Sequence, residues 1–172
     1  MKKAVIVTDV QNKIFNSSPN PYMADEVIEN INLIIKKARK SDNPVIFLQH
    51  EAPGFLEFNS DDWQLYEKIE DEHVDYRIRK TAGDAFLGTD LEETLKSLNI
   101  RHILICGYAS EFCIDSTTRR AAGLGYNVEL ISDAHTTHDK QHLTAEQIRN
   151  HHNATLSMDP TINAISSQDI AF

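Results

Sequence analysis

The chain has 172 residues, of which 41% are hydrophobic and 25% charged, and this composition is typical of a globular domain and argues against disorder. One domain spanning 1–172 can bury a real core, and the formal net charge of -9 argues against nucleic acid or an anionic membrane as a partner. No apolar run is long enough to span a bilayer, and two cysteines without a disulfide framework favour a reducing compartment. We therefore expect a cytoplasmic protein.

Short apolar runs alternate with helical segments along the chain. The predicted strands are 4–7, 45–48, 76–78, 103–106, 127–131 and, at one edge, 162–165. The predicted helices are 23–40, 91–98, the segment between Ser110 and Gly123, and one that follows Thr144. Thr89 with Glu92, and Thr144 with Gln147, have the spacing of capping boxes. This alternation predicts a three-layer α/β/α fold with a six-stranded parallel sheet in the Rossmann-like order 3-2-1-4-5-6.

Two stretches carry neither pattern. Residues 11–21 contain Asn, Ser and Pro and are typical of a loop. Residues 51–73 lack a clean period and mix acidic residues with the aromatic residues Phe55, Phe58, Trp63 and Tyr66. A connection this long inside a compact domain is uncommon and usually functional, so we expect it to form a pocket wall or a subunit interface.

Cys113 lies at the junction between a buried strand and a helix. If Ser110 is the N-cap, Cys113 is the third helical residue, and its N–H is one of the unpaired donors of the helix start. The helix dipole favours an anion there and lowers the pKa of a thiol, which predicts a thiolate nucleophile. The alternative is a small cysteine that fills a gap beside the sheet, as we expect for Cys106 inside the strand.

Three chemically useful side chains are predicted to meet at one edge of the sheet. Asp9 follows the first strand, Lys80 follows the third, and Cys113 follows the fourth. Ligands of such sheets bind beyond the carboxyl ends of the strands, where the strand order reverses. A base, a cation and a thiol are the groups that nucleophilic catalysis needs together.

Several histidines suggest other chemistry. His135, His138 and His142 are spaced three and four residues apart, but the stretch lacks a helical signal before Thr144 and a matching carboxylate spacing, so we expect no metal. His135 or His138 could instead be the base of a Cys–His hydrolase. A non-catalytic, receiver-like module with Mg²⁺ near Asp9 is a third hypothesis, although it would need clustered carboxylates.

The order and separation of several short motifs are specific. They are Asp9-Val10-Gln11 with Phe15; Lys80 with Asp84-Ala85-Phe86; Thr89 with Leu91; Gly107 through Cys113 followed by Ser116-Thr117; and Gly125-Tyr126-Asn127-Val128 before Asp133-Ala134. This pattern resembles the isochorismatase-like cysteine hydrolases, which include nicotinamidases and related amidases. The resemblance covers nearly the whole chain.

The resemblance implies a catalytic triad of Asp9, Lys80 and Cys113. It implies a cis peptide bond between Tyr108 and Ala109, and an oxyanion hole formed by the backbone N–H groups of Ala109 and Cys113. It also implies that the chain cleaves an amide-type C–N bond of a small molecule through a thioester, without a cofactor, as a homo-oligomer.

The sequence departs from the nicotinamidase pattern where Gln49-His50-Glu51 replaces the family's Asp-x-His metal motif. We therefore expect no metal and doubt nicotinamide as the substrate. An isochorismatase-type reaction on a non-amide molecule and a non-catalytic, ligand-binding member of the fold are the alternatives. From position in the chain, the expected substrate contacts are Gln11, Phe15, His50, Trp63, Tyr108 and Phe112.

Overall fold

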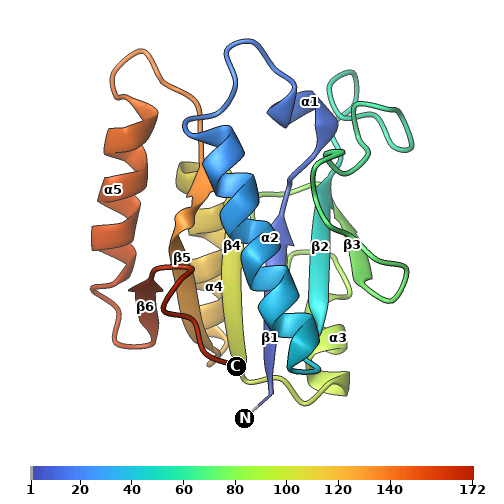
Figure 1. Cartoon of the computed structure of the whole chain (residues 1–172), viewed down its shortest axis with the longest axis vertical. Helices are drawn as coiled ribbons and strands as arrows, with labels where there is room; N and C mark the ends of the chain where they lie inside the picture. The colour runs from blue at the N-terminus through green and yellow to red at the C-terminus, as the bar shows by residue number, and fades with distance from the viewer. Residues whose placement is uncertain (1) are drawn as a thin grey trace.

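The computed structural model describes residues 2–172 and contains a six-stranded sheet whose neighbouring strands are all parallel (Figure 1). The strands are β1 (Lys3–Thr8), β2 (Val45–His50), β3 (Tyr76–Lys80), β4 (His102–Tyr108), β5 (Asn127–Thr136) and β6 (Ile162–Ile165). Their order is β3-β2-β1-β4-β5-β6, which confirms the predicted topology. The strand order reverses between β1 and β4 at the centre of the sheet.

Helices cover both faces of this sheet. They are α1 (Asn12–Phe15), α2 (Ala24–Lys40), α3 (Leu91–Ser97), the π-helical turn η1 (Ser110–Ile114), α4 (Asp115–Gly123) and α5 (Ala145–Leu156). Figure 1 shows α2 in front of the sheet and α3 and α4 behind it. Val5 and Val7 of β1 join the core on the α2 side, while Ala4 and Ile6 join the core on the opposite side. Burial on both faces explains why the central strands read as continuous apolar runs.

Of the two predicted capping boxes, the structure confirms the one at Thr144 and not the one at Thr89. Thr144 accepts a hydrogen bond from the Gln147 N–H and completes the box that begins α5. The box at Thr89 was wrong, because Asp90 is the N-cap of α3 and the Thr89 hydroxyl donates to the Ala85 carbonyl. None of the helices in the described part of the chain has the length and apolar character needed to cross a bilayer.

The two segments without a sequence pattern pack against each other. Residues 11–21, expected to be a loop, contain the single turn of α1. Residues 51–73 form turns, and Leu65 makes an isolated bridge to Gln11. Trp63 and Tyr66 are buried in the core on the α2 side. These two aromatic residues therefore anchor the connection to the body of the protein.

Gly107 allows β1 and β4 to approach each other closely. Its φ of +117° lies in a region that L side chains rarely adopt, and a Cβ at this position would lie 2.1 Å from the Thr8 carbonyl oxygen. The pairing of β4 with β5 shifts register between Ile105 and Gly107. This glycine lies at the carboxyl end of β4, directly before the residues that carry the candidate site.

We expect Gly107→Ala to lower the free energy of unfolding by about 2–5 kcal/mol, because it adds both backbone strain and a steric clash. Urea denaturation followed by circular dichroism measures this change. Gly123→Ala is the matched control: no atom lies within 4 Å of the added Cβ, and helix α4 should be unchanged or slightly more stable. Equal stability of Gly107→Ala and the natural protein would contradict the assigned role of Gly107.

Candidate active site

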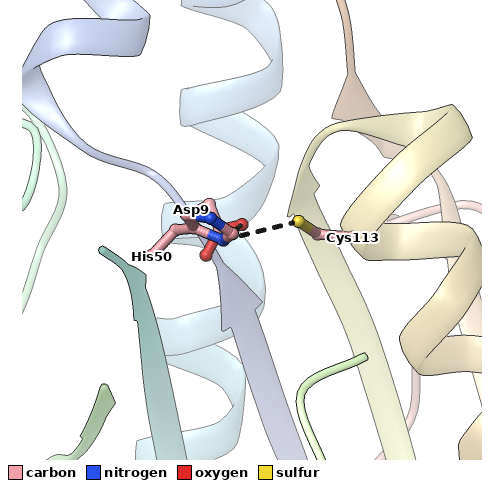
Figure 2. Close-up of side chains that lie close together, drawn as sticks. All are labelled: Asp9, His50 and Cys113. Atoms are coloured by element: carbon pink, nitrogen blue, oxygen red, sulfur yellow. Dashed lines mark hydrogen bonds and ion pairs between the residues drawn. The ribbon is translucent and has the colours of Figure 1, made fainter. Parts of the chain in front are cut away.

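The Lys80 side chain contacts the other candidate residues at the carboxyl edge of the sheet. Its Nζ lies 2.9 Å from Asp9 Oδ2, 3.2 Å from Cys113 Sγ and 3.0 Å from His50 Nδ1. Figure 2 shows Asp9 and His50 on neighbouring strand ends, facing Cys113 across the point where the strand order reverses. The lysine side chain is fully buried. The structure thus brings together Asp9, Lys80 and Cys113 as the topology predicted.

Asp9 is held in a sparsely populated backbone conformation. Its φ is +53°, which aspartate tolerates better than most residues, and its N–H donates to the Leu48 carbonyl at 2.9 Å. Asp9 Oδ2 accepts the hydrogen bond of Lys80. Asp9 Oδ1 is buried, and among residues 2–172 it has no hydrogen-bond partner. One carboxylate oxygen is therefore left to accept a proton.

Cys113 belongs to a π-helical turn and not to a regular helix start. The N-cap is Ala109 and not Ser110, so Cys113 is the fourth residue of the turn and not the third. The Ile114 N–H donates to the Ala109 carbonyl at 3.1 Å. The peptide bond between Tyr108 and Ala109 is cis. Such π turns are frequent at functional sites because they re-aim a single side chain.

The pKa of the Cys113 thiol is shifted in the direction opposite to the one predicted from the sequence. Burial and the negative charge of Asp9 raise this pKa to about 12, while Lys80 acts in the lowering direction. For Lys80, burial opposes the charged form, but Asp9 and Cys113 raise the pKa of the ammonium above its ordinary value. Burial and the nearby Lys80 lower the pKa of His50, so this ring is neutral and its Nδ1 accepts from Lys80. The resting site therefore holds a thiol beside a charged lysine.

Asp9, His50 and Cys113 also have the composition of a metal site. Their ligand atoms lie within 4.8 Å of one another. The Lys80 ammonium, however, lies within 3.2 Å of one atom from each of the three residues. A cation bound at their centre would have to displace this buried charge. The three ligand atoms are therefore arranged around the Lys80 ammonium group, which fits them better than a metal ion would.

A cavity of about 220 Å³ opens onto Cys113. Its lining residues, most of them apolar, are Asp9, Ile14, His50, Ala52, Phe55, Leu56, Tyr108, Ala109, Phe112 and Cys113. Three of the six expected substrate contacts, His50, Tyr108 and Phe112, belong to this wall. The prediction missed Ile14, Ala52 and Leu56, and the only sequence signal for the Phe55 contact was the aromatic character of residues 51–73.

Gln11, Phe15 and Trp63 are not among the residues that line this cavity, and their role as substrate contacts stays a prediction. The Gln11 amide donates to the carbonyls of His50 and Trp63 at 3.0 and 2.8 Å and accepts from the His50 N–H at 2.9 Å. Its hydrogen-bonding groups are used to hold the backbone at the end of β2. Phe15 is fully buried and stacks on Tyr66 with ring centroids 5.5 Å apart. Trp63 is 8% exposed and belongs to the same core.

The sequence also did not reveal a buried chain of hydrogen bonds that supports the turn of Cys113. His135 is fully buried, and its Nδ1 and Nε2 lie 2.8 Å from Ser110 Oγ and Asn153 Oδ1. Because the Asn153 oxygen only accepts, Nε2 carries the proton and Nδ1 accepts from Ser110. Burial lowers the pKa of His135 to about 4, so the ring is neutral near pH 7.

The two histidines considered as bases are both occupied elsewhere. His135 bonds to Ser110 and Asn153, whereas His138 contacts the Tyr108 hydroxyl at 2.8 Å and Ser17 Oγ at 2.9 Å. The Cys113 sulfur instead lies 4.0 Å from His50 Nδ1, which already accepts from Lys80. The hypothesis of a Cys–His hydrolase based on His135 or His138 was therefore wrong.

Comparisons with known proteins match this architecture. The family model of the Isochorismatase domain matches residues 3–160. Streptothricin hydrolase of Streptomyces noursei is 31% identical over 139 residues, which are 80% of this chain but only 50% of that protein's length. Ureidoacrylate amidohydrolase RutB of Caulobacter segnis is 26% identical over 171 residues, covering 76% of this chain and 71% of that protein. A crystal structure described as an Isochorismatase family protein is 36% identical, with a TM-score of 0.90 and coverage of 95% and 98%.

The buried His135 should make the fold sensitive to acid. Its folded pKa of about 4 lies below the ordinary value of 6.5, so the unfolded chain binds the proton more tightly. Stability from this group is full above pH 6.5 and is lost as the pH falls from 6.5 to about 4, by about 3 kcal/mol.

Urea denaturation at several pH values between 7 and 4 measures this loss, with His135→Gln as the comparison, because glutamine can still hydrogen-bond but does not titrate. The variant should start less stable at pH 7 and show a shallower decline. The same decline in both proteins would contradict the assignment.

Proposed function

The chain belongs to the isochorismatase family, and we propose from this that it is a cysteine-dependent hydrolase that cleaves an amide-type C–N bond of a small molecule. The observation that carries the proposal is the contact of Lys80 with both Asp9 Oδ2 and Cys113 Sγ, two residues that line one cavity. These residues supply a base, a cation and a nucleophile. We assign the catalytic roles to Asp9, Lys80 and Cys113.

In the first half of the reaction, the Cys113 sulfur attacks the carbonyl carbon of the amide. The thiol keeps its proton at neutral pH, so Asp9 takes this proton as the C–S bond forms. The oxyanion that develops accepts hydrogen bonds from the backbone N–H groups of Ala109 and Cys113, both in the cavity wall. The charge of Lys80 stabilises the negative charge that passes between sulfur and carboxylate.

In the second half, Asp9 returns its proton to the leaving nitrogen and the C–N bond breaks. The acyl group then remains on Cys113 as a thioester. A water molecule attacks the thioester carbonyl while Asp9 accepts one proton of the water, and the C–S bond breaks as the proton returns to sulfur. The balance is one amide and one water converted into one carboxylic acid and one amine or ammonia.

The two alternative functions account for fewer features of this site. An isochorismatase-type reaction on a non-amide molecule leaves the paired thiol and carboxylate without a defined role. A non-catalytic module gives no reason for a buried ion pair beside an unpartnered carboxylate oxygen, which is costly to maintain. The name of one relative, a hydrolase, supports hydrolysis, and that of another, an amidohydrolase, supports amide chemistry.

Assembly into a homo-oligomer stays a prediction. The exposed side chains of Phe55 and Phe112 line the cavity and form apolar surface that a second copy could cover.

A panel of amides and ureido compounds, assayed for release of ammonia or amine, tests the reaction. Cys113→Ala should lower turnover to background, and Asp9→Asn should lower it by about 10²–10⁴-fold because the proton acceptor is lost. Full activity of Cys113→Ala would end the proposal.

Asp9→Asn should nevertheless increase the rate at which iodoacetamide alkylates Cys113 at pH 8. The substitution removes the negative charge that raises the thiol pKa and leaves the cation of Lys80 in place. Intact-mass spectrometry follows the alkylation. Cys113→Ala is the control for Cys106, which is fully buried and has a raised pKa. Slower alkylation in Asp9→Asn would contradict the assigned electrostatics.

A further inference from the structure

A second, larger cavity adjoins the one at Cys113. Its volume is about 440 Å³, twice that of the first. Ile14, Phe55 and Tyr108 line both cavities, so the two spaces share one wall. A substrate with its scissile carbonyl at Cys113 can be too large for the first cavity. The rest of such a molecule can extend into the second cavity.

The second cavity differs from the first in chemistry. Its further lining residues are polar or charged: Asn12, Lys13, Asn16, Ser17, Asp62 and His138. Lys13 Nζ and Asp62 Oδ2 lie 2.9 Å apart, so the charges of this wall cancel. The wall thus carries no net charge.

The shared wall is fixed by hydrogen bonds. Tyr108 O–H contacts His138 Nδ1 at 2.8 Å, and His138 Nε2 contacts Ser17 Oγ at 2.9 Å. The Ser17 hydroxyl also lies 2.7 Å from the Ile14 carbonyl oxygen. These bonds hold Tyr108 between the apolar and the polar space. A substrate that spans both must therefore present different chemistry on its two sides.

We propose that the substrate is an amide with a polar, overall neutral extension that lies in the second cavity. Hydroxyl-bearing, amide-bearing and zwitterionic groups belong to this class. The Lys13–Asp62 pair selects against a net charge on the extension. This inference rests on the proposed function, because that function places the scissile bond at Cys113.

The ion pair allows the selectivity to be changed in both directions. The side chains of Lys13 and Asp62 are 42% and 50% exposed, so their substitution should leave the fold intact. Asp62→Asn leaves the lysine charge alone and should favour an anionic extension. Lys13→Gln leaves the carboxylate alone and should favour a cationic extension.

The probes are iodoacetamide and its N-hydroxyethyl, N-carboxyethyl and N-(trimethylammonio)ethyl derivatives, which carry a neutral, an anionic and a cationic extension. Each alkylates Cys113 when sulfur displaces iodide, and intact-mass spectrometry at pH 9 gives the rate relative to plain iodoacetamide. The natural protein should favour the hydroxyethyl probe. Asp62→Asn should raise the relative rate of the carboxyethyl probe, and Lys13→Gln that of the trimethylammonioethyl probe, each about two- to five-fold.

Asp25→Asn and Lys68→Gln are matched controls, because this exposed ion pair of 2.9 Å lies outside both cavities. An unchanged ranking in Asp62→Asn and Lys13→Gln, or the same shift in the control variants, would overturn the inference. The probes report on Cys113 without turnover, so this result does not depend on finding a hydrolysed amide. Activity of Cys113→Ala would instead remove the proposed function and leave the cavity result standing.

Discussion

The ammonium group of Lys80 lies between Asp9 Oδ2 at 2.9 Å and Cys113 Sγ at 3.2 Å, and the rest of the site is arranged around it. Three segments far apart in the chain meet at this one buried cation. Removing a partner from a buried ion pair typically costs about 3–5 kcal/mol, because a charge is left uncompensated. The neutral ring of His50 adds a third acceptor for this cation.

The balance of charges around the thiol shapes the proposed chemistry. Burial and Asp9 outweigh Lys80 and hold the pKa of Cys113 at about 12, so the resting nucleophile is a thiol. In the proposed mechanism, proton transfer to Asp9 therefore accompanies attack on the carbonyl. We assign the acceptor role to Asp9 Oδ1, which is buried and has no hydrogen-bond partner among residues 2–172. The same oxygen can return the proton to the leaving nitrogen.

The sheet order and the meeting of Asp9, Lys80 and Cys113 could be predicted from the sequence, because buried parallel strands are short apolar runs whose carboxyl ends share one edge. The cavity wall could not. Residues 51–73 have no hydrophobic period. The sequence therefore could not show that Trp63 belongs to the core whereas Phe55 lines the cavity. The π turn and the raised thiol pKa also escaped prediction, since both depend on tertiary packing that a local helix-start argument omits.

The most direct test of the central cation is a ¹⁵N NMR titration of the Lys80 side chain in the resting protein, with Lys80→Gln used to assign the signal. Because Asp9 and Cys113 raise its pKa, Lys80 should keep its proton to a higher pH than an ordinary lysine does. In Asp9→Asn the same signal should lose its proton at lower pH than in the natural protein. A neutral amine at pH 7, or a titration that does not respond to Asp9→Asn, would contradict the account.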